Sequence, residues 1–347
     1  MSDAVPSRAG EIYSMPGMTS MTIAIASYQR RGPLLRLLRT LDQQLAGSEQ
    51  LRRDLDVVVV LDGSTDGSRQ AATTAVSTVP VRVYWQPNRG LAAARNVGLE
   101  AAKGRIVWFL DDDLVPSPGL VARHRHAHDQ SSAQVMVGPC RVPPDAGAPD
   151  PLLDWWDSFY QELAAAGTID RFDRFTTANA SGPPELFTAV GGFDEDFSTY
   201  GLEDYELAVR LLRAGTRIRF DPDAVAWHPD VPPISVLVRR ERSLGFNAVR
   251  MARLHPDTVD VLFPLGTATR HRRLLRLLHL RTPASLMALS RLAFAVSRLA
   301  RPLHSGAARR AEHLSRVAAH TSGVAAADPG GPFLDRVLGY PVDAGAR

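Results

Sequence analysis

Short apolar runs alternate with amphipathic segments along the first third of the chain. Apolar runs at residues 21–28, 55–62, 81–85 and 105–110 predict strands. Between them, leucine or alanine at helical spacing predicts helices at residues 32–45, from about 68, and at 90–104, where Gly104 ends the last one. Because strand and helix alternate, we expect a doubly wound α/β sheet with right-handed crossovers. Ligands bind beyond the carboxyl ends of the strands in such a sheet, so we expect the functional site there.

The pattern changes after residue 140. Residues 141–156 are rich in proline, and few helix or strand signals follow until about residue 176, which predicts a long loop of functional importance. From Gly192 the pattern predicts a loop and an amphipathic helix that ends at Gly215, followed by short strands at 217–220 and 224–228. We therefore divide the chain into a disordered leader (1–20), an α/β domain (21–232), a basic amphipathic helical region (233–320) and a weakly ordered tail (321–347).

Composition is that of a globular protein. The chain has 347 residues, of which 45% are hydrophobic, so it can bury a sizeable core. The single cysteine, Cys140, excludes an intramolecular disulfide and a zinc site built from cysteines, which fits a reducing cytosol. Residues 1–20 lack an apolar stretch of signal-peptide length, so the expected location is cytoplasmic.

Charge is distributed unevenly. The net charge is +3, but residues 231–320 contain 16 arginines and 4 acidic residues, a balance of +12 that leaves −9 on the rest of the chain. Arginines and prolines interrupt the apolar stretches of this arm, so none reaches the roughly 20 residues that a membrane-spanning helix needs. Two interpretations remain open. The helices lie on an anionic membrane, such as the inner face of the plasma membrane, or they pack on the α/β domain or a second subunit.

Three consecutive aspartates follow the strand at 105–110. Adjacent carboxylates repel one another unless a cation offsets the repulsion. Asp111 and Asp113 could share Mg²⁺ or Mn²⁺, ions that prefer oxygen ligands and that often bind substrate phosphates as well. The alternative is that these are surface acids at the end of a strand.

Polar and aromatic residues also stand near other strand ends. Tyr28 could stack on a nucleobase or simply pack, and Asp62 could accept a hydrogen bond from a base or form an ordinary turn. Arg95 lies in a helix of small residues and could reach a base or a diphosphate, or remain solvated.

Five segments occur in the order seen in one enzyme family: "IASYQR", "VVLDGSTD", "NRGLAAARNVGL", "FLDDDLVPSPG" and "GGFDEDFSTYGLEDYELAVRLLRAG". Together they make residues 21–230 resemble the family 2 glycosyltransferases with the GT-A fold. The resemblance implies a GT-A catalytic domain at 21–232, with a mixed sheet and a C-terminal helical extension. It also implies transfer of a sugar from a nucleotide-diphosphate donor, usually with inversion and with Mn²⁺ or Mg²⁺. We favour a UDP-sugar, although Leu61 stands where the family often has a further aspartate.

The resemblance also implies roles for particular residues. Asp111 and Asp113 match the motif for metal and diphosphate, Asp112 lies inside it, and the metal ligand is open between Asp112 and Asp113. Asp62 and Arg95 match base-binding positions. Glu203 and Asp204 match the acidic pair near the acceptor, where Asp204 is the expected general base that deprotonates the acceptor hydroxyl. These acids could instead merely complement the positive N-terminus of the helix that follows.

Four later residues complete the candidate set. His228 ends the strand at 224–228 and is a candidate ligand of the same metal, or a structural histidine. Gly192 would permit close approach to the sugar, and Trp155 and Trp156 could stack on a sugar ring or fill a core. The acceptor could be a polysaccharide, a lipid-linked sugar or a small metabolite.

Other functions compete with glycosyl transfer. One is an inactive relative that binds a sugar or a nucleotide. Another is a nucleic-acid-binding protein that acts through the basic arm, which we disfavour because few aromatic residues lie between its arginines. A phosphate-binding loop of the NTPase type is also disfavoured, because Lys103 is the only lysine and follows no G-x-x-x-x-G segment.

Overall fold

A mixed sheet forms the centre of the molecule. The computed structural model describes residues 21–53, 55–129, 134–143, 151–230, 233–263, 270–300 and 305–338. Within these ranges the main sheet has seven strands in the order β3-β2-β1-β4-β8-β6-β9. Their bounds are Met21–Ser27 (β1), Leu55–Asp62 (β2), Val81–Gln86 (β3), Ile106–Leu110 (β4), Gln134–Val137 (β6), Asn179–Gly182 (β8) and Arg217–Phe220 (β9). Strands β1 to β4 run parallel to one another, and β8 is antiparallel to β4 and β6. The predicted α/β fold with a mixed sheet is confirmed.

The central strands are largely apolar because helices cover both faces of the sheet. In β2 every residue is buried. Val57 and Val59 pack with the leucines of α1 (Arg31–Ala46), whereas Val58 and Val60 pack with Ala94 of α4 (Leu91–Glu100). Successive residues of a strand point to opposite faces, so burial on both faces gives a continuous apolar run instead of an alternating one. Shorter helices complete this half of the domain: α2 (Glu49–Arg53), α3 (Ser68–Thr73) and α5 (Leu120–Asp129).

The segment predicted as a long loop contains a helix, so that prediction is wrong. Helix α6 spans Pro151–Ala166, and residues 144–150 lie outside the described part of the chain. Tyr160 and Leu163, one helical turn apart, are buried, and the Tyr160 ring stacks on Phe220 of β9 at 6.1 Å. The proline-rich flank masked this helical spacing in the sequence. The elements that follow are a 3₁₀ turn (Phe172–Arg174), α7 (Pro184–Thr188) and α8 (Glu203–Arg213).

A small second sheet brings the end of the α/β domain back to the aspartate segment. Its strands are β5 (Val115–Pro116), β10 (Ala226–Trp227) and β7 (Cys140–Arg141), with β10 in the middle. Because β10 pairs with β5, His228 follows a strand that is anchored just beyond the three aspartates. The sheet therefore brings together two segments that are far apart in the sequence.

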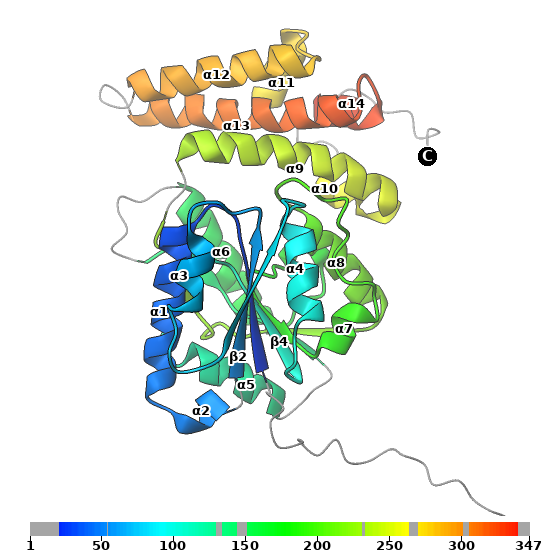
Figure 1. Cartoon of the computed structure of the whole chain (residues 1–347). Coiled ribbons are helices and arrows are strands. Elements are labelled where there is room, and N and C mark those ends of the chain that lie inside the picture. Colours follow the sequence, from blue (N-terminus) through cyan, green and yellow to red (C-terminus); the bar gives the residue numbers. More distant parts are fainter. Residues whose placement is uncertain are drawn as a thin grey trace, which may run out of the picture.

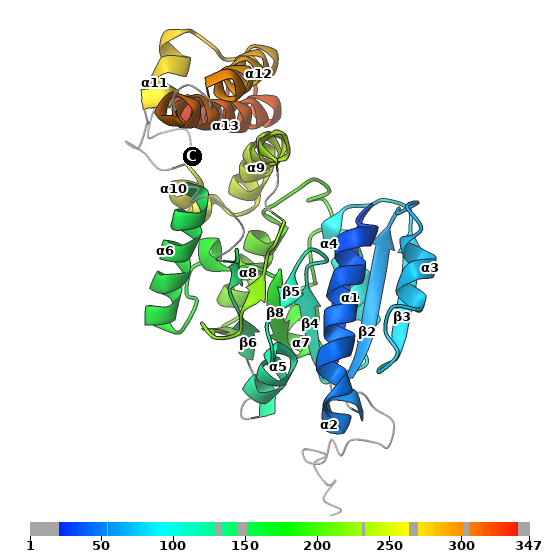
Figure 2. The same ribbon diagram turned by 90° about the vertical axis from the view of Figure 1, so that its left-hand side faces the viewer.

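A layer of helices stacks beyond one end of the sheet (Figure 1). Its members are α9 (Ile234–Leu254), a 3₁₀ turn (Pro256–Thr258), α10 (Val259–Leu262), α11 (Arg270–Leu277), α12 (Pro283–Ala300), α13 (Ser305–Ala327) and α14 (Pro332–Leu338). Figure 2 shows this layer above α6 and α8, to one side of β2 and β3. Phe197 and Leu202 of the α/β domain share a buried cluster with Val249 and Met251 of α9. The helical layer thus shares part of its hydrophobic core with the α/β domain. Within the described ranges, no helix combines the length and the apolar character needed to cross a bilayer.

The predicted boundary at residue 320 does not separate two structural units. Helix α13 continues to Ala327, and Leu334, Val337 and Leu338 of α14 are buried, so residues 321–338 are not a weakly ordered tail. A Cβ on Gly323 would lie 1.9 Å from the backbone oxygen of Arg242 in α9. Only small residues permit such a close crossing of two helices. Because small residues give a weak hydrophobic pattern, the sequence did not predict this part of α13 as a helix. Residues 1–20 and 339–347 lie outside the described part of the chain.

Candidate functional site

Several candidate residues lie just beyond the carboxyl ends of β1, β2 and β4. These strand ends face the helical layer (Figures 1 and 2). Asp112 and Asp113, just after β4, are both buried. Arg30, which follows β1, donates to Asp112 Oδ1 at 3.1 Å and forms a second ion pair with Asp113. His228 Nε2 lies 3.3 Å from Asp113 Oδ2. Two buried carboxylates therefore face a guanidinium and an imidazole from other parts of the chain.

These contacts shift the pKa values of the two aspartates in opposite directions. Burial and the negative charges of Asp113 and Asp111 raise the pKa of Asp112 to about 7, against the opposing charge of Arg30. Burial also acts to raise the pKa of Asp113, but His228 and Arg30 outweigh it and hold that pKa below its ordinary value. Asp113 is therefore the carboxylate of the pair that stays ionised at neutral pH. Ligands of hard cations must be deprotonated, so Asp113 suits that role better.

We tested whether the residues present fit a divalent cation. Asp113 and His228 are close enough to act as two ligands, and Mg²⁺ or Mn²⁺ commonly completes its shell with substrate phosphates and water. One buried oxygen, Asp112 Oδ2, has no hydrogen-bond partner among the described residues. The Arg30 guanidinium across Asp112 and Asp113 shows that this pair attracts positive charge. Across the described ranges, no group of three or more ligand-type side chains could hold a metal ion, and Asp111 is paired with Arg95.

Arg95 connects the aspartate segment to the acidic start of α8. Its guanidinium is buried and donates to Asp111 Oδ1 at 2.8 Å and to Glu203 Oε1 at 2.7 Å. It also lies over the Phe193 ring, 5.6 Å from the centroid. The sequence suggested that Arg95 reaches a base or a diphosphate. The structure instead places it between two carboxylates, where it holds β4 and α8 together.

Asp204 differs from Glu203 in its partners. Glu203 is buried and paired with Arg95, whereas Asp204 is partly buried and forms no ion pair with any residue in the described ranges. Its Oδ1 accepts a hydrogen bond from the Tyr205 amide at 2.9 Å. Burial, followed by the negative charge of Glu203, raises the pKa of Asp204 to about 7. A carboxylate with this pKa can accept a proton near neutral pH, as a general base must.

The backbone before α8 fixes the direction of this acidic pair. Gly201 and Leu202 both have positive φ, 92° and 73°. Asn247 of α9 donates from Nδ2 to the Gly201 carbonyl at 2.7 Å. A leucine in the left-handed region is unusual and needs support from its surroundings. The contact from α9 supplies support, so the helical layer stabilises the turn that presents Glu203 and Asp204.

Asp62 and Tyr28 lie near the ends of β2 and β1. The buried Asp62 carboxylate accepts hydrogen bonds from Gln86 Nε2 (2.8 Å), from the Arg89 amide (2.8 Å) and from the Gly90 amide (2.9 Å). Asp62 thus anchors the loop that leads into α4. Tyr28 is 52% exposed, which leaves its ring accessible to a stacking partner. A role in base binding stays a prediction for both residues.

Gly192 lies in a loop that packs closely on α4. It is buried with φ of 70°, and a Cβ there would lie 2.8 Å from Asn96 Oδ1. Asn96 accepts from the Phe193 amide at 2.8 Å and donates to the Phe193 carbonyl at 2.9 Å. The small size of Gly192 therefore lets its loop dock on α4, and close approach of a sugar to this loop stays a prediction. Trp155 and Trp156 lie on α6, and their side chains are outside the described part of the structure.

Sequence reasoning missed Arg30 and Asn96. Both occur inside segments that the analysis singled out, "IASYQR" and "NRGLAAARNVGL". Their partners, Asp112, Asp113 and Phe193, are distant in the chain, so no local pattern identified the contacts.

Comparisons with known proteins agree with this architecture. Residues 22–189 match the family model described as Glycosyl transferase family 2, and residues 158–226 match the N-terminal domain of galactosyltransferase. The chain is 30% identical over 285 residues to validoxylamine A glucosyltransferase of Streptomyces hygroscopicus subsp. limoneus. That match covers 73% of this chain and 61% of the relative, so the chain spans about three fifths of the relative's length.

Two solved structures share the fold at low sequence identity. Mannosyltransferase PcManGT from Pyrobaculum calidifontis, in complex with GDP-Man and Mn²⁺, has a TM-score of 0.59 at 20% identity and covers 88% of this chain and 87% of its own. S. aureus TarS 1-349 in complex with UDP has a TM-score of 0.53 at 18% identity and covers 89% of this chain and 91% of its own.

Proposed function

Because the chain belongs to glycosyltransferase family 2 and has the GT-A fold, we propose that it transfers a sugar from a nucleotide-diphosphate donor to an acceptor hydroxyl. The Asp111–Arg95–Glu203 bridge carries the proposal, because it joins the aspartate segment to the acidic start of α8 in one site. An inactive relative, the alternative function, would not need the Asp204 carboxylate, which forms no ion pair within the described ranges, next to this bridge.

Asp204 is the proposed general base. It accepts the proton of the acceptor hydroxyl while the hydroxyl oxygen bonds to the anomeric carbon. The bond from that carbon to the diphosphate oxygen breaks on the opposite side, its electron pair leaves with the nucleoside diphosphate, and the configuration inverts. Asp113 and His228 would hold Mn²⁺ or Mg²⁺, which when bound neutralises charge on the departing diphosphate.

We favour a UDP-sugar as the donor, with Tyr28 stacked on the base and Asp62 beside it. The relatives' complexes contain different nucleotides, GDP-Man in the mannosyltransferase and UDP in TarS. The base is therefore best identified by direct binding.

Calorimetric titration of UDP, GDP and dTDP, with and without Mn²⁺, tests the donor site. We expect one nucleotide to bind in a metal-dependent manner and the Asp113→Ala variant to lose that dependence, since Asp113 is the ionised ligand candidate. Asp170→Asn, at an exposed aspartate that is not a candidate site residue, serves as the control and should bind as the wild type does. Failure of all three nucleotides to bind the wild type would contradict the proposal. Release of the nucleotide from the matching sugar donor then tests transfer.

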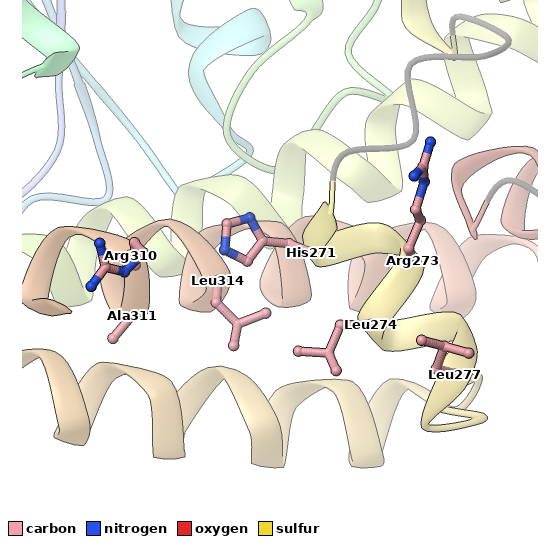
Figure 3. Close-up of a pocket in the computed structure, with 7 residues that line it drawn as sticks. All are labelled: His271, Arg273, Leu274, Leu277, Arg310, Ala311 and Leu314. Carbon is pink, nitrogen blue, oxygen red and sulfur yellow. The ribbon is translucent and has the colours of Figure 1, made fainter. Parts of the chain in front are cut away.

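We also propose that α11 and α12 rest on an anionic membrane surface. Leu277, Leu292 and Leu299 are 72%, 62% and 75% exposed. Residues 270–300 contain arginines but no aspartate or glutamate, so a second copy of this face would bring like charges together, whereas anionic lipid complements it. Figure 3 shows Leu274 and Leu277 of α11 beside an apolar pocket that Leu314 of α13 also lines.

Sedimentation with liposomes tests this surface. We expect the wild type to pellet with vesicles containing phosphatidylglycerol and not with neutral phosphatidylcholine vesicles. Combined Leu277→Ser, Leu292→Ser and Leu299→Ser should weaken lipid binding at least about tenfold, because full burial of even one leucine contributes roughly 1.5–3 kcal/mol. Val261→Ser, at an exposed position of α10, is the control. The membrane proposal would be contradicted if the triple variant bound the vesicles as well as the wild type does. It would also be contradicted if the wild type self-associated and the three changes abolished that self-association.

A further inference from the structure

One side of α9 lies along residues 194–202, the loop that leads into α8. Near the beginning of this loop, Arg250 forms ion pairs with two aspartates, at 3.1 and 2.6 Å. Near its end, Asn247 bonds to backbone carbonyls, and the guanidinium carbon of Arg240 lies 4.5 Å from the centroid of a tyrosine ring. Residues three or seven apart share one side of a helix. The loop is therefore held at several points by one side of α9.

The hydrogen bonds of the Asn247 side chain within the described ranges all go to the turn before α8. Its Nδ2 donates to the Gly201 carbonyl at 2.7 Å, with longer contacts to the carbonyls of Tyr200 (3.4 Å) and Thr199 (3.5 Å). Its Oδ1 accepts from the Thr199 hydroxyl at 3.4 Å. The residue is only 2% exposed. A buried amide costs free energy unless its donors and acceptors are satisfied, so the burial of Asn247 depends on this turn.

Backbone geometry and packing make the turn depend on α9 in return. Leu202 has a φ of 73°, in the left-handed region, which a leucine rarely adopts without support from its surroundings. A Cβ on Gly201 would lie 2.5 Å from Leu244 Cδ2, so α9 packs directly on the turn. Asp204 comes two residues after Leu202 in the chain. A change in the backbone at Leu202 would therefore redirect the Asp204 carboxylate.

We infer that Asn247 is a positioning residue for the general base. This inference rests on the proposed function. By binding the carbonyls of residues 199–201, Asn247 fixes the turn and, through it, the place of the Asp204 carboxylate relative to the acceptor hydroxyl. Misplacement of a catalytic group by about 1 Å can slow a reaction on the order of 10²-fold. Because Asn247 contacts the turn and not Asp62 or Asp113, we expect it to affect the rate of proton transfer and not donor affinity.

Kinetics on the full chain separate positioning from binding. The assay is release of nucleotide from the sugar donor whose nucleotide the wild type binds, in saturating Mn²⁺ and with water as the acceptor. Asn247→Ala should lower kcat about 10–100-fold and leave the KM for the donor within about threefold of the wild-type value. Val337→Ala, at a buried position of α14, is the matched control for packing lost from the helical layer and should keep the wild-type kcat.

A milder variant tests the same turn at the surface. Arg240→Gln removes the cation over the exposed Tyr200 ring and should lower kcat in the same direction by a smaller factor. This variant keeps the inference testable if Asn247→Ala does not fold. Arg239→Gln, at the exposed neighbour on α9, is its matched control and should react as the wild type does.

The pH profile provides a readout that lost stability alone would not change. The charged groups around Asp204 are Glu203 on α8, Arg95 on α4 and Asp111 after β4, and burial is the largest cause of its raised pKa. A turn that loosens admits water to the carboxylate, which lowers that pKa. The acidic limb of kcat/KM should therefore lie at lower pH in Asn247→Ala than in the wild type.

The outcomes distinguish this inference from the proposed function. If the wild type releases nucleotide and Asn247→Ala releases it equally fast with the same acidic limb, the inference is overturned and the proposed function stands. An equal loss of kcat in Val337→Ala also overturns it, because Asn247 would then contribute only to stability. An effect confined to the KM for the donor overturns it as well. If the wild type releases no nucleotide, the proposed function and the inference both fail.

Discussion

The Asp204→Asn variant is expected to transfer sugar about 10²–10⁴-fold more slowly than the wild type, while its nucleotide affinity stays within about twofold. Asparagine keeps the size of the side chain and its hydrogen bond from the Tyr205 amide, but it cannot accept a proton. The rate is measured as nucleotide release under saturating donor and acceptor, and affinity by calorimetry. Asp170→Asn is the control for a charge lost elsewhere.

The same residue predicts the pH dependence of the reaction. The pKa of Asp204 is raised to about 7, so Asp204 is protonated and inactive as a base below that pH. The wild-type kcat/KM should therefore fall about tenfold for each pH unit below 7 and level off above it. Asp204→Asn should lack this limb. If the variant keeps both the rate and the limb, Asp204 is not the base, and Glu203 becomes the residue to test.

The Arg95→Met variant is expected to unfold at lower urea concentration, with a loss of about 3–5 kcal/mol of stability. The cause is Glu203, which is 4% exposed and has Arg95 as its ion-pair partner in the described structure. Methionine fills much of the volume but leaves the carboxylate buried without a counter-charge. Equilibrium unfolding in urea, followed by tryptophan fluorescence, measures the change. Arg53→Met, at an exposed pair with Glu49, should cost less than about 1 kcal/mol.

A second variant separates lost charge from lost packing. Arg95→Met combined with Glu203→Gln should recover a large part of the stability, because the buried charge is then absent. It should not recover sugar transfer, since Asp111 and the start of α8 lose their common partner. If the single Arg95→Met change leaves stability at the wild-type level, the bridge is not the element that holds β4 and α8 together.

The hydrophobic pattern was sufficient to predict the strands of the parallel half of the sheet. β1, β2, β3 and β4 begin and end within a residue or two of the predicted runs. A strand buried on both faces must be largely apolar along its length, which explains β1, β2 and β4, whereas β3 is a partly exposed edge strand. The pattern failed for α6 and for residues 321–338. Their burial depends on close contacts with distant partners, Phe220 for Tyr160 and Arg242 for Gly323, which no local window contains.

The candidate site divides in the same way. The sequence motifs were sufficient to predict acidic residues at the ends of strands and at the start of the helix that is α8. Their different chemistry arises from folding. Arg95 pairs with Asp111 and Glu203, Arg30 and His228 face Asp113, and Asp204 remains without an ion pair in the described structure. Coulomb energy depends on separation in space and on burial, not on distance along the chain. The local sequence could therefore identify the acids, but the packing of the elements determined which of them are free to react.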